Sequence, residues 1–262
     1  MSERALNPSP TAIGIDIGGT GIKGGIVDLS AGKLIGERVR IDTPKPATPA
    51  AVAEVVAQIV SELAARAEAP EAQGPVGVAF PAIIHRGVAR SAANVDKSWI
   101  GTDVDALFTE RLGRTVHVMN DADAAGLAEA RFGAGEGIEG TVLVITLGTG
   151  IGSALIHDGV LVPNVELGHL EIDSAVAETR ASASARERDE LSWKEYAKRL
   201  QRFFSHVEFL FSPTLFIIGG GISKRAEDYL PRLSLDTPIT VATSKNNAGI
   251  VGAALQWGLS QP

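Results

Sequence analysis

The segment AIGIDIGGTGIKGG, Ala12 to Gly25, decides the fold of this chain. Its first half alternates apolar residues with glycine or aspartate, which is typical of a β-strand. The apolar positions are Ile13, Ile15 and Ile17. Three glycines then predict a turn, and a second strand-like run begins at Ile26. The turn glycines are Gly18, Gly19 and Gly21. The segment therefore predicts a hairpin with an open backbone at its tip.

The residue types in this turn indicate a phosphate-binding loop. Glycine lets backbone N–H groups approach a phosphate, Thr20 adds a hydroxyl donor, and Lys23 adds a flexible positive charge. Asp16 repels a phosphate but can hold the divalent metal ion that accompanies one. A glycine hairpin without a ligand is the structural alternative, and the presence of Asp16, Thr20 and Lys23 in one turn favours the ligand-binding interpretation.

A dinucleotide-binding fingerprint is also present in this segment, but its context is wrong. Gly19, Gly21 and Gly24 satisfy the G-x-G-x-x-G spacing, which must be followed by a helix. Here an apolar, strand-like run extends to Leu29, and another strand-like stretch follows at Leu34 to Ile41. We therefore exclude a nicotinamide-binding fold. The chain also contains no G-x-x-x-x-G-K-[ST] sequence.

The composition limits the class of protein. The chain has 262 residues, 45% of them hydrophobic, and no apolar run approaches the roughly 18 residues that span a bilayer. The first ten residues do not resemble a signal peptide, so we expect a cytoplasmic protein with no membrane partner. The absence of cysteine excludes disulfides, cysteine-based zinc sites and thiol catalysis. A net charge of −7 argues against nucleic-acid binding.

A second glycine turn repeats the pattern of the first. Thr141 to Leu147 is a continuous apolar strand, the turn contains Gly148, Thr149 and Gly150, and a further strand is predicted at Ser153 to Ile156. Two strand-glycine-strand elements, one in each half of the chain, suggest a duplicated fold. We expect the halves to face each other across a cleft, each with a phosphate loop.

Three further clusters combine polar or glycine residues with strand ends. Asn120 and Asp121 follow a predicted strand and precede a helix expected at Ala124 to Phe132; Asp121 is either the acid at the helix start or a functional carboxylate at the edge of a sheet. Glu166 to Glu171 places two acids and His169 within six residues, which suits hydrogen bonds to a polyhydroxylated ligand. The run Gly219, Gly220 and Gly221 lets a flat ligand lie on the backbone, or packs a strand tightly, before a helix that Ser223 could cap.

Helices are predicted on both sides of these clusters. Thr48 and Pro49 begin one that extends to Leu63, and Ser192 with Glu195 forms a capping box for another. The small-residue helix Ala248 to Leu259 could return to pack on the first half. Basic residues gather in and before the capping-box helix, either as a solvated face or as an attraction for a long polyanion. These residues are Arg180, Arg186, Arg188, Lys194, Lys198 and Arg202.

Five motifs together resemble the sugar kinases of the repressor/open-reading-frame/kinase family. They are Asp16 to Lys23, Asn120-Asp121, Leu147 to Gly152, Glu166 to His169, and Gly219 to Gly221. The resemblance implies an α/β chain with the actin-like ATPase fold, also called ribonuclease H-like. That fold has two lobes with a mixed sheet in each and an active-site cleft between them. We expect residues 1–119, with helix 247–262 packed back on them, in the small lobe and residues 120–246 in the large lobe.

The resemblance also implies the roles of individual residues. Asp121 would be the catalytic base that accepts the proton of the sugar's 6-hydroxyl. The other sugar hydroxyls would be held by Asn94, Asn120, Glu166, His169 and Glu178. The phosphates and the nucleotide of the donor would be bound at the three glycine runs: Asp16, Gly18, Gly19, Thr20, Gly21 and Lys23; Gly148, Thr149 and Gly150; and Gly219, Gly220 and Gly221. Mg²⁺ would lie near Asp16, and His169 would contact sugar instead of zinc because the zinc-loop cysteines of metal-binding relatives are missing.

Within this family the chain is most similar to polyphosphate-dependent glucokinases, and specifically to polyphosphate/ATP glucomannokinases. The resemblance implies transfer of a phosphoryl group from inorganic polyphosphate or ATP to the 6-hydroxyl of glucose, and of mannose. It also implies a homodimer. A hexose or N-acetylhexosamine kinase that uses only ATP is an alternative. A sugar-sensing regulator is a second one, although about a dozen residues before the first strand are too few for a helix-turn-helix.

Overall fold

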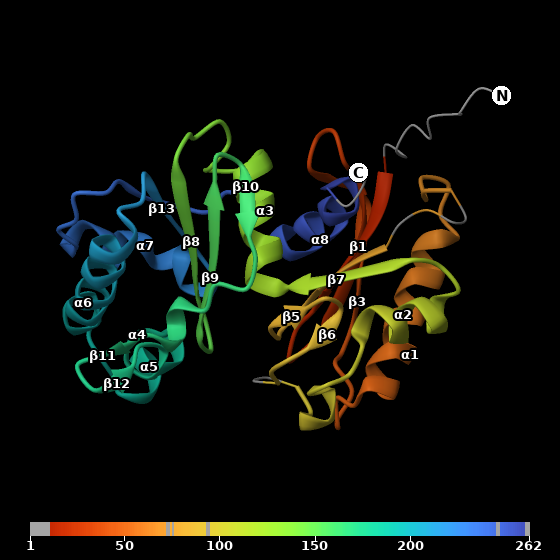
Figure 1. Cartoon of the computed structure of the whole chain (residues 1–262), viewed down its shortest axis with the longest axis horizontal. Coiled ribbons are helices and arrows are strands. Elements are labelled where there is room, and N and C mark those ends of the chain that lie inside the picture. Colours follow the sequence, from red (N-terminus) through yellow and green to blue (C-terminus); the bar gives the residue numbers. More distant parts are fainter. Residues whose placement is uncertain (1–10, 72–73, 75, 93–94, 245–246, 260–262) are drawn as a thin grey trace. The chain divides into compact units, whose positions relative to one another are not determined.

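The computed structural model describes residues 11–71, 74, 76–92, 95–244 and 247–259 of the 262-residue chain. The chain divides into two compact units. The first ends at Ala124 and resumes at Gly249, and the second runs from Ala125 to Ala248. Each unit contains a five-stranded sheet (Figure 1). The lobe boundaries that we expect from the sequence, at 119/120 and 246/247, stay a prediction.

The first unit is built on a mixed sheet with the strand order β3-β2-β1-β4-β7. Strands β1, β2 and β3 form an antiparallel meander, and β4 and β7 continue it in parallel. The strands are β1 (Thr11–Ile17), β2 (Ile22–Asp28), β3 (Lys33–Ile41), β4 (Val76–Phe80) and β7 (Val116–Asn120). Around them lie α1 (Pro49–Ala64), the small pair β5 (Ile84–His85) and β6 (Val88–Ala89), η1 (Lys97–Trp99), α2 (Val104–Leu112) and α8 (Ala248–Leu259).

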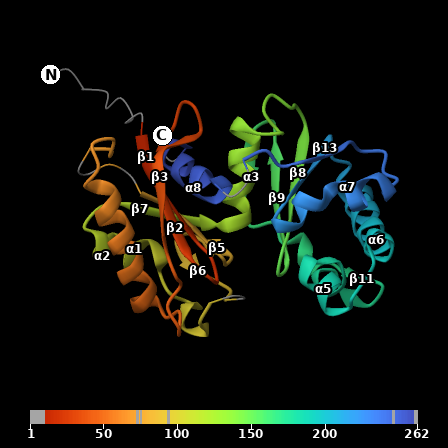
Figure 2. The same cartoon turned by 180° about the vertical axis from the view of Figure 1, so that it is seen from behind.

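Glycines allow two helices to cover opposite faces of this sheet (Figures 1 and 2). A Cβ on Gly24 would lie 2.5 Å from Ile59 of α1. On the other face, a Cβ on Gly14 would lie 2.0 Å from the carbonyl oxygen of Ile250, and one on Gly77 would lie 1.8 Å from that of Ala253. Because no side chain fits there, the backbone of α8 rests directly on β1 and β4. This small-residue helix is part of the first unit.

The second unit repeats the same arrangement of strands. Its sheet has the order β10-β9-β8-β13-β14, with an antiparallel meander followed by two parallel strands. The strands are β8 (Thr141–Leu147), β9 (Ile151–His157), β10 (Val160–Val162), β13 (Leu215–Gly219) and β14 (Ile239–Val241). The other elements are α3 (Asp121–Phe132), which begins in the first unit, η2 (Leu167–His169), β11 (Glu171–Ile172), β12 (Ala175–Val176), α4 (Glu178–Ala181), α5 (Ala183–Arg188), α6 (Trp193–Phe211), η3 (Gly221–Arg225), α7 (Ala226–Tyr229) and η4 (Leu230–Arg232).

The second sheet is also covered on both faces. Leu200, Phe203 and Phe204 of α6 pack in one buried cluster with residues of β8 and β13. The opposite face, with Val142, Val144 and Ile217, contacts α3 and the segment that follows it. The two matching sheets confirm the prediction of an α/β chain with a mixed sheet in each half. They also show the duplication that the two glycine turns suggest.

Local sequence signals for the helix starts are confirmed in two cases and wrong in two. The Thr48 side chain caps α1, and Ser192 and Glu195 form the predicted capping box of α6. However, α3 begins at Asp121 and not at Ala124. Ser223 caps no helix: it lies inside η3, and its hydroxyl donates to the carbonyl oxygen of Gly220 at 2.8 Å. In the described part of the chain, no helix is long and apolar enough to cross a membrane.

Candidate functional site

The first glycine turn connects β1 and β2 and is held by groups outside it. The N–H of Gly18 donates to the carbonyl oxygen of Gly21 at 3.1 Å. The carbonyl of Gly18 accepts from Thr43, and that of Thr20 accepts from Arg40 at 3.1 Å. A Cβ on Gly21 would lie 2.8 Å from the Arg40 guanidinium, so only glycine leaves that side chain in place. Sequence reasoning missed Arg40 and Thr43; the signal is their position at the end of β3, beside the turn.

Asp16 and Lys23 lie directly opposite each other on β1 and β2 and form an ion pair. Lys23 Nζ lies 3.2 Å from Asp16 Oδ2, and both side chains are partly buried. Asp16 also faces the start of α8, where a Cβ on Gly249 would lie 3.0 Å from its carboxyl carbon. A single carboxylate of this kind fits Mg²⁺, which retains several water ligands and otherwise binds through one or two carboxylates and the phosphates of a substrate. Asp16 therefore could hold the metal ion that accompanies a phosphate donor.

Asn120 and Asp121 lie at the junction of β7 and α3. Asn120 is buried, and its Oδ1 accepts from the N–H groups of Ala122 at 2.8 Å and Asp123 at 3.1 Å, which makes it the cap of α3. Its amide donates to the carbonyl of Ala82 at 3.1 Å, which leaves one N–H for a ligand. The N–H of Ala122 is shared with Asp121, whose Oδ1 lies 2.9 Å from it, whereas the N–H of Asp123 donates to Asn120. Asp121 is solvent-exposed in the first turn of α3, where the helix dipole favours a negative charge.

The second glycine turn connects β8 and β9 and touches a carboxylate. The N–H of Gly148 donates to the carbonyl oxygen of Gly150 at 3.0 Å. Glu178 accepts from the N–H of Ile151 at 3.3 Å, and a Cβ on Gly150 would lie 2.4 Å from Glu178 Oε2. Ser184 also binds the turn, donating from its N–H to Gly148 and from its hydroxyl to Thr149. The turn and Glu178 therefore form one unit of structure, and sequence reasoning missed the contribution of Ser184.

Glu166, His169 and Glu178 are brought together within the second unit. Ser153 of β9 holds the loop that carries Glu166 and His169, since its hydroxyl donates to the carbonyl of Val165 and accepts from the N–H of Leu167. Burial raises the pKa of Glu166, the positive charge of His169 lowers it, and the negative charge of Glu178 raises it again. His169 Nδ1 lies 3.9 Å from Glu178 Oε1. Two carboxylates and an imidazole at this spacing can accept from and donate to neighbouring hydroxyl groups.

The third glycine run is partly explained by packing. Gly220 has a φ of 82°, and a Cβ there would lie 2.4 Å from the carbonyl oxygen of Leu147. A Cβ on Gly219 would lie 3.1 Å from Thr146. By contrast, no atom of the described residues lies within 4 Å of the position a Cβ on Gly221 would take. Gly219 and Gly220 thus bring β13 close to β8, and the open side of Gly221 is the part of the run that a ligand can approach.

The structure places the predicted site residues in two groups, one in each unit. The first unit contains the first glycine turn with Asp16 and Lys23, and the junction with Asn120 and Asp121. The second unit contains the second and third glycine runs and the Glu166, His169 and Glu178 cluster. Asn94 lies outside the described residues. No group of three or more histidine, cysteine, aspartate or glutamate side chains that could hold a metal ion occurs among the residues that the structure describes.

Comparison with known proteins identifies the family. The sequence model of the ROK family matches residues 12–182, which include both hairpin turns, Asp121 and the Glu166 to Glu178 cluster. The chain belongs to the ROK family. The chain has the actin-like fold of the ROK kinases.

Three relatives of this ROK chain are informative. The polyphosphate glucokinase of Mycobacterium tuberculosis is 50% identical over 243 residues, which cover 92% of this chain and 89% of the relative. The inorganic polyphosphate/ATP-glucomannokinase of Arthrobacter sp. strain KM is 71% identical, with a TM-score of 0.92 over 96% of this chain and 99% of that one. A ROK family glucokinase from Streptomyces griseus, in complex with glucose and AMPPNP, is 25% identical, with a TM-score of 0.79 over 93% and 98%.

The contact between Gly150 and Glu178 leads to a prediction about the KM of this ROK chain for the hexose. In the variant Gly150→Ala the new methyl group displaces the flexible end of Glu178, and the backbone of the turn stays in place. We expect the KM for the hexose to rise by roughly tenfold, the loss typical of one charged hydrogen bond, with the thermal unfolding midpoint almost unchanged. Steady-state kinetics with varied hexose measure this effect.

Gly148→Ala is the matched control, because in the described part of the chain nothing lies within 4 Å of the position that its Cβ takes. This variant should leave the KM for the hexose unchanged. Equal KM values for the hexose in Gly150→Ala and the wild type would contradict the coupling of the turn to Glu178.

The raised pKa of Glu166 predicts a pH dependence. A carboxylate accepts hydrogen bonds from hydroxyl groups more strongly when ionised than when protonated. Because burial raises its pKa above the ordinary 4.5, Glu166 loses its proton only at a higher pH. We expect kcat/KM for the hexose to fall as the pH is lowered through this raised pKa. In Glu166→Gln this acidic limb should disappear, and kcat/KM should be lower at neutral pH. A Glu166→Gln profile with the same limb as the wild type would assign the titration to another group.

Proposed function

We propose that this chain is a hexokinase-type phosphotransferase that moves a phosphoryl group from inorganic polyphosphate or ATP to the 6-hydroxyl of glucose. The observation that carries the proposal is the 71% identity to the Arthrobacter glucomannokinase over 96% of this chain, with a TM-score of 0.92. The 50% identity to the mycobacterial polyphosphate glucokinase supports the same donor and acceptor. Mannose is a second acceptor in this proposal, because the printed name of the Arthrobacter enzyme includes it.

Asp121 is the catalytic base in the proposed reaction. Its carboxylate lies in the first turn of α3, where one oxygen accepts from the N–H of Ala122, and the Asn120 side chain accepts from the N–H groups of both Ala122 and Asp123. The carboxylate accepts the proton of the sugar hydroxyl as the oxygen attacks the phosphorus atom. Phosphoryl transfer proceeds through a loose transition state, so the base acts late and an ordinary aspartate is sufficient.

Glu166, His169 and Glu178 orient the sugar in the proposed reaction. The Ser153 hydroxyl and the N–H of Ile151 fix the loop and Glu178 before the sugar arrives, so little ordering remains to be done on binding. Asn120 adds one amide N–H, and Asn94 is a further proposed contact. These groups determine which hexose binds, because each pairs with a hydroxyl whose absence or inversion would leave it unpaired.

The glycine turns bind the phosphates of the donor in this proposal. The N–H groups of Gly18 and Gly148 close the two turns, and the backbone N–H groups of Gly19, Thr20 and Gly21 in the first unit and of Thr149 and Gly150 in the second are the proposed donors to phosphate. Lys23 supplies a positive charge, and its ion pair with Asp16 fixes its direction. Mg²⁺ held at Asp16 would neutralise negative charge on the phosphates. The open side of Gly221 is the proposed place of contact for the rest of a nucleotide donor.

A donor-by-acceptor assay tests the proposed function. Purified protein is incubated with ATP or long-chain polyphosphate and with glucose, mannose or an N-acetylated hexose, and the hexose 6-phosphate is measured. We expect both donors to phosphorylate glucose and mannose, and neither to phosphorylate N-acetylated hexoses. Activity with ATP alone would remove polyphosphate from the proposal and leave a sugar kinase. The absence of hexose 6-phosphate with every donor would overturn it.

Asp121→Asn tests the assignment of the base. The amide cannot accept the proton, so we expect kcat to fall by about 10²- to 10⁴-fold with both donors. Hexose binding, measured by calorimetry, should change little, since the amide keeps the size of the carboxylate. Glu166→Gln is the control for a residue that only orients the sugar, and it should raise KM more than it lowers kcat. A kcat for Asp121→Asn close to that of the wild type would exclude Asp121 as the base.

A further inference from the structure

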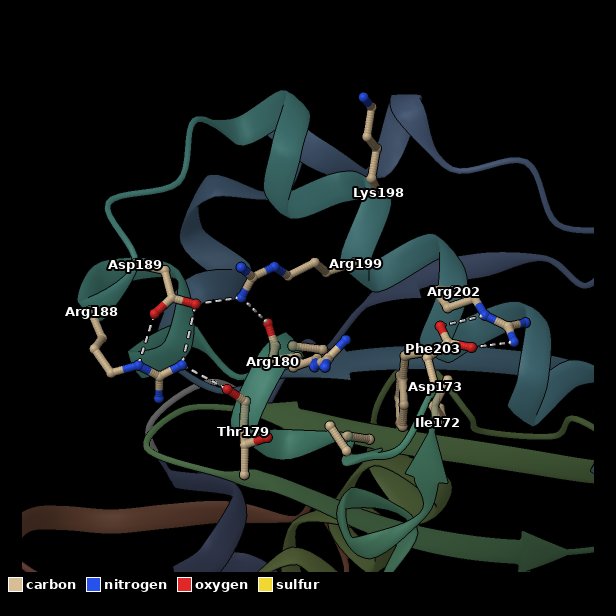
Figure 3. Close-up of a pocket in the computed structure, with 13 residues that line it drawn as sticks. Ile172, Asp173, Thr179, Arg180, Arg188, Asp189, Lys198, Arg199, Arg202 and Phe203 are labelled. Atoms are coloured by element: carbon tan, nitrogen blue, oxygen red, sulfur yellow. Dashed lines mark hydrogen bonds and ion pairs between the residues drawn. The ribbon is translucent and has the colours of Figure 1, made fainter.

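A pocket in the second unit lies outside the glycine turns and outside the cluster of Glu166, His169 and Glu178. It has a volume of about 740 Å³ and is formed by α4, α5, α6 and the β11-β12 pair (Figure 3). This volume is within the range of sites for small ligands, about 300–1,000 Å³. We call it the basic pocket and define it by its five cationic side chains, Arg180, Arg188, Lys198, Arg199 and Arg202.

The basic pocket concentrates positive charge in an acidic protein. Its five cations face two carboxylates, Asp173 and Asp189, which leaves an excess of three positive charges. The chain as a whole has a net charge of −7. A local positive potential of this kind attracts anions that the rest of the surface repels. A ligand for the pocket must therefore carry several negative charges.

Two carboxylates fix three of the cations in place. Asp189 accepts from Arg188 at 2.8 Å and from Arg199 at 2.6 Å. Asp173 accepts from both Nε and one terminal nitrogen of Arg202, at 2.9 and 2.8 Å. Arg188 and Arg199 also donate to the carbonyl oxygens of Thr179 and Arg180. The guanidiniums are thus oriented before a ligand arrives, and Figure 3 shows them spread along the pocket.

The other two cations are available for a ligand. Within the described residues, the side chains of Arg180 and Lys198 form no hydrogen bond or ion pair, and both are exposed. Guanidinium and ammonium groups are the side chains that bind phosphate oxygens most strongly. A ligand with several phosphates can contact these two groups directly and can interact with the oriented guanidiniums around them.

The basic pocket is connected to the second glycine turn by two short helices. Glu178, the first residue of α4, contacts the turn, while Arg180 in the same helix lines the pocket. Ser184, near the start of α5, donates to the turn, and Arg188 at the end of α5 lines the pocket. A helix of six residues is roughly 9 Å long. The turn and the pocket therefore lie at the two ends of one short helix, α5.

We propose that the basic pocket is a second subsite for inorganic polyphosphate, which binds phosphates of the chain remote from the one that is transferred. This inference rests on the proposed function, because it assigns the pocket to the donor of that reaction. Polyphosphate is a linear chain with a negative charge on each phosphate, so it can occupy the turn and the pocket together. The triphosphate of ATP ends in a nucleoside and supplies no further phosphates. Two connected subsites bind one chain more tightly than either subsite alone.

The double variant Arg180→Ala/Lys198→Ala tests the subsite. It removes two cations whose side chains form no hydrogen bond or ion pair within the described residues, and it leaves the ion pairs of Asp173 and Asp189 intact. We expect the KM for long-chain polyphosphate to rise by roughly 5- to 20-fold at low ionic strength. The KM for tripolyphosphate, the KM for ATP and every kcat should remain unchanged. The difference from the wild type should shrink as salt is added, because exposed charges are screened.

Lys194→Ala is the matched control, since Lys194 lies one turn from Lys198 on α6 but does not line the pocket. It should leave the KM for long-chain polyphosphate nearly unchanged. An unchanged KM in the double variant, or an equal rise for all three donors, would overturn the subsite and leave the proposed function intact. A wild-type protein that uses ATP but no polyphosphate would overturn the polyphosphate function, and the subsite with it.

Discussion

The hydrogen bond from the N–H of Ile151 to Glu178 is the interaction on which the second unit's chemistry depends. It joins a turn that suits phosphate to a carboxylate that suits a sugar hydroxyl, and it needs glycine at position 150 because a Cβ would meet Glu178 Oε2 at 2.4 Å. Glu178 also begins α4, and α4 is followed by α5, whose Ser184 binds the same turn. One contact therefore links the second glycine turn to Glu178 and to the helices of the basic pocket.

The first unit depends on a different constraint, the direct contact of α8 with the sheet. Gly14 and Gly77 let the helix backbone lie against β1 and β4, and Gly252 lets it lie against Ala124 at the start of α3. The same approach places Gly249 beside Asp16, since a Cβ on Gly249 would lie 3.0 Å from the carboxyl carbon of Asp16. A side chain at any of these positions would push α8 away from the strand that carries Asp16. The C-terminal helix is therefore part of the support of the first glycine turn.

Patterns that act over a few residues were sufficient to predict much of this structure. The alternation around Ile13 to Ile17 and the capping box at Ser192 each report a local preference, and the structure confirms the strand and the capping box. The predicted start of α3 was wrong because Asn120 and Asp121 can each cap a helix. The buried side chain of Asn120, at the end of β7, accepts the N–H of Ala122 in the first turn. The spacing of basic residues in the sequence did not predict which of them line the basic pocket. Arg186 lies over the ring of Trp193 at 3.7 Å and does not line the pocket, whereas Arg199 does.

The two carboxylates in the basic pocket clarify how an anion site can exist on an acidic protein. Five cations without counter-ions would repel one another and point into water. Asp189, whose pKa is lowered to about 2 by hydrogen bonds from Arg188 and Arg199, stays ionised at any physiological pH and keeps those guanidiniums in place. Exposed ion pairs of this kind contribute little to the free energy of unfolding. These ion pairs act on geometry instead. Each carboxylate cancels one positive charge of the pocket and holds guanidinium N–H groups at fixed positions. A site built in this way favours a ligand with regularly spaced charges over a single small anion, because only the former can contact several of those positions at once.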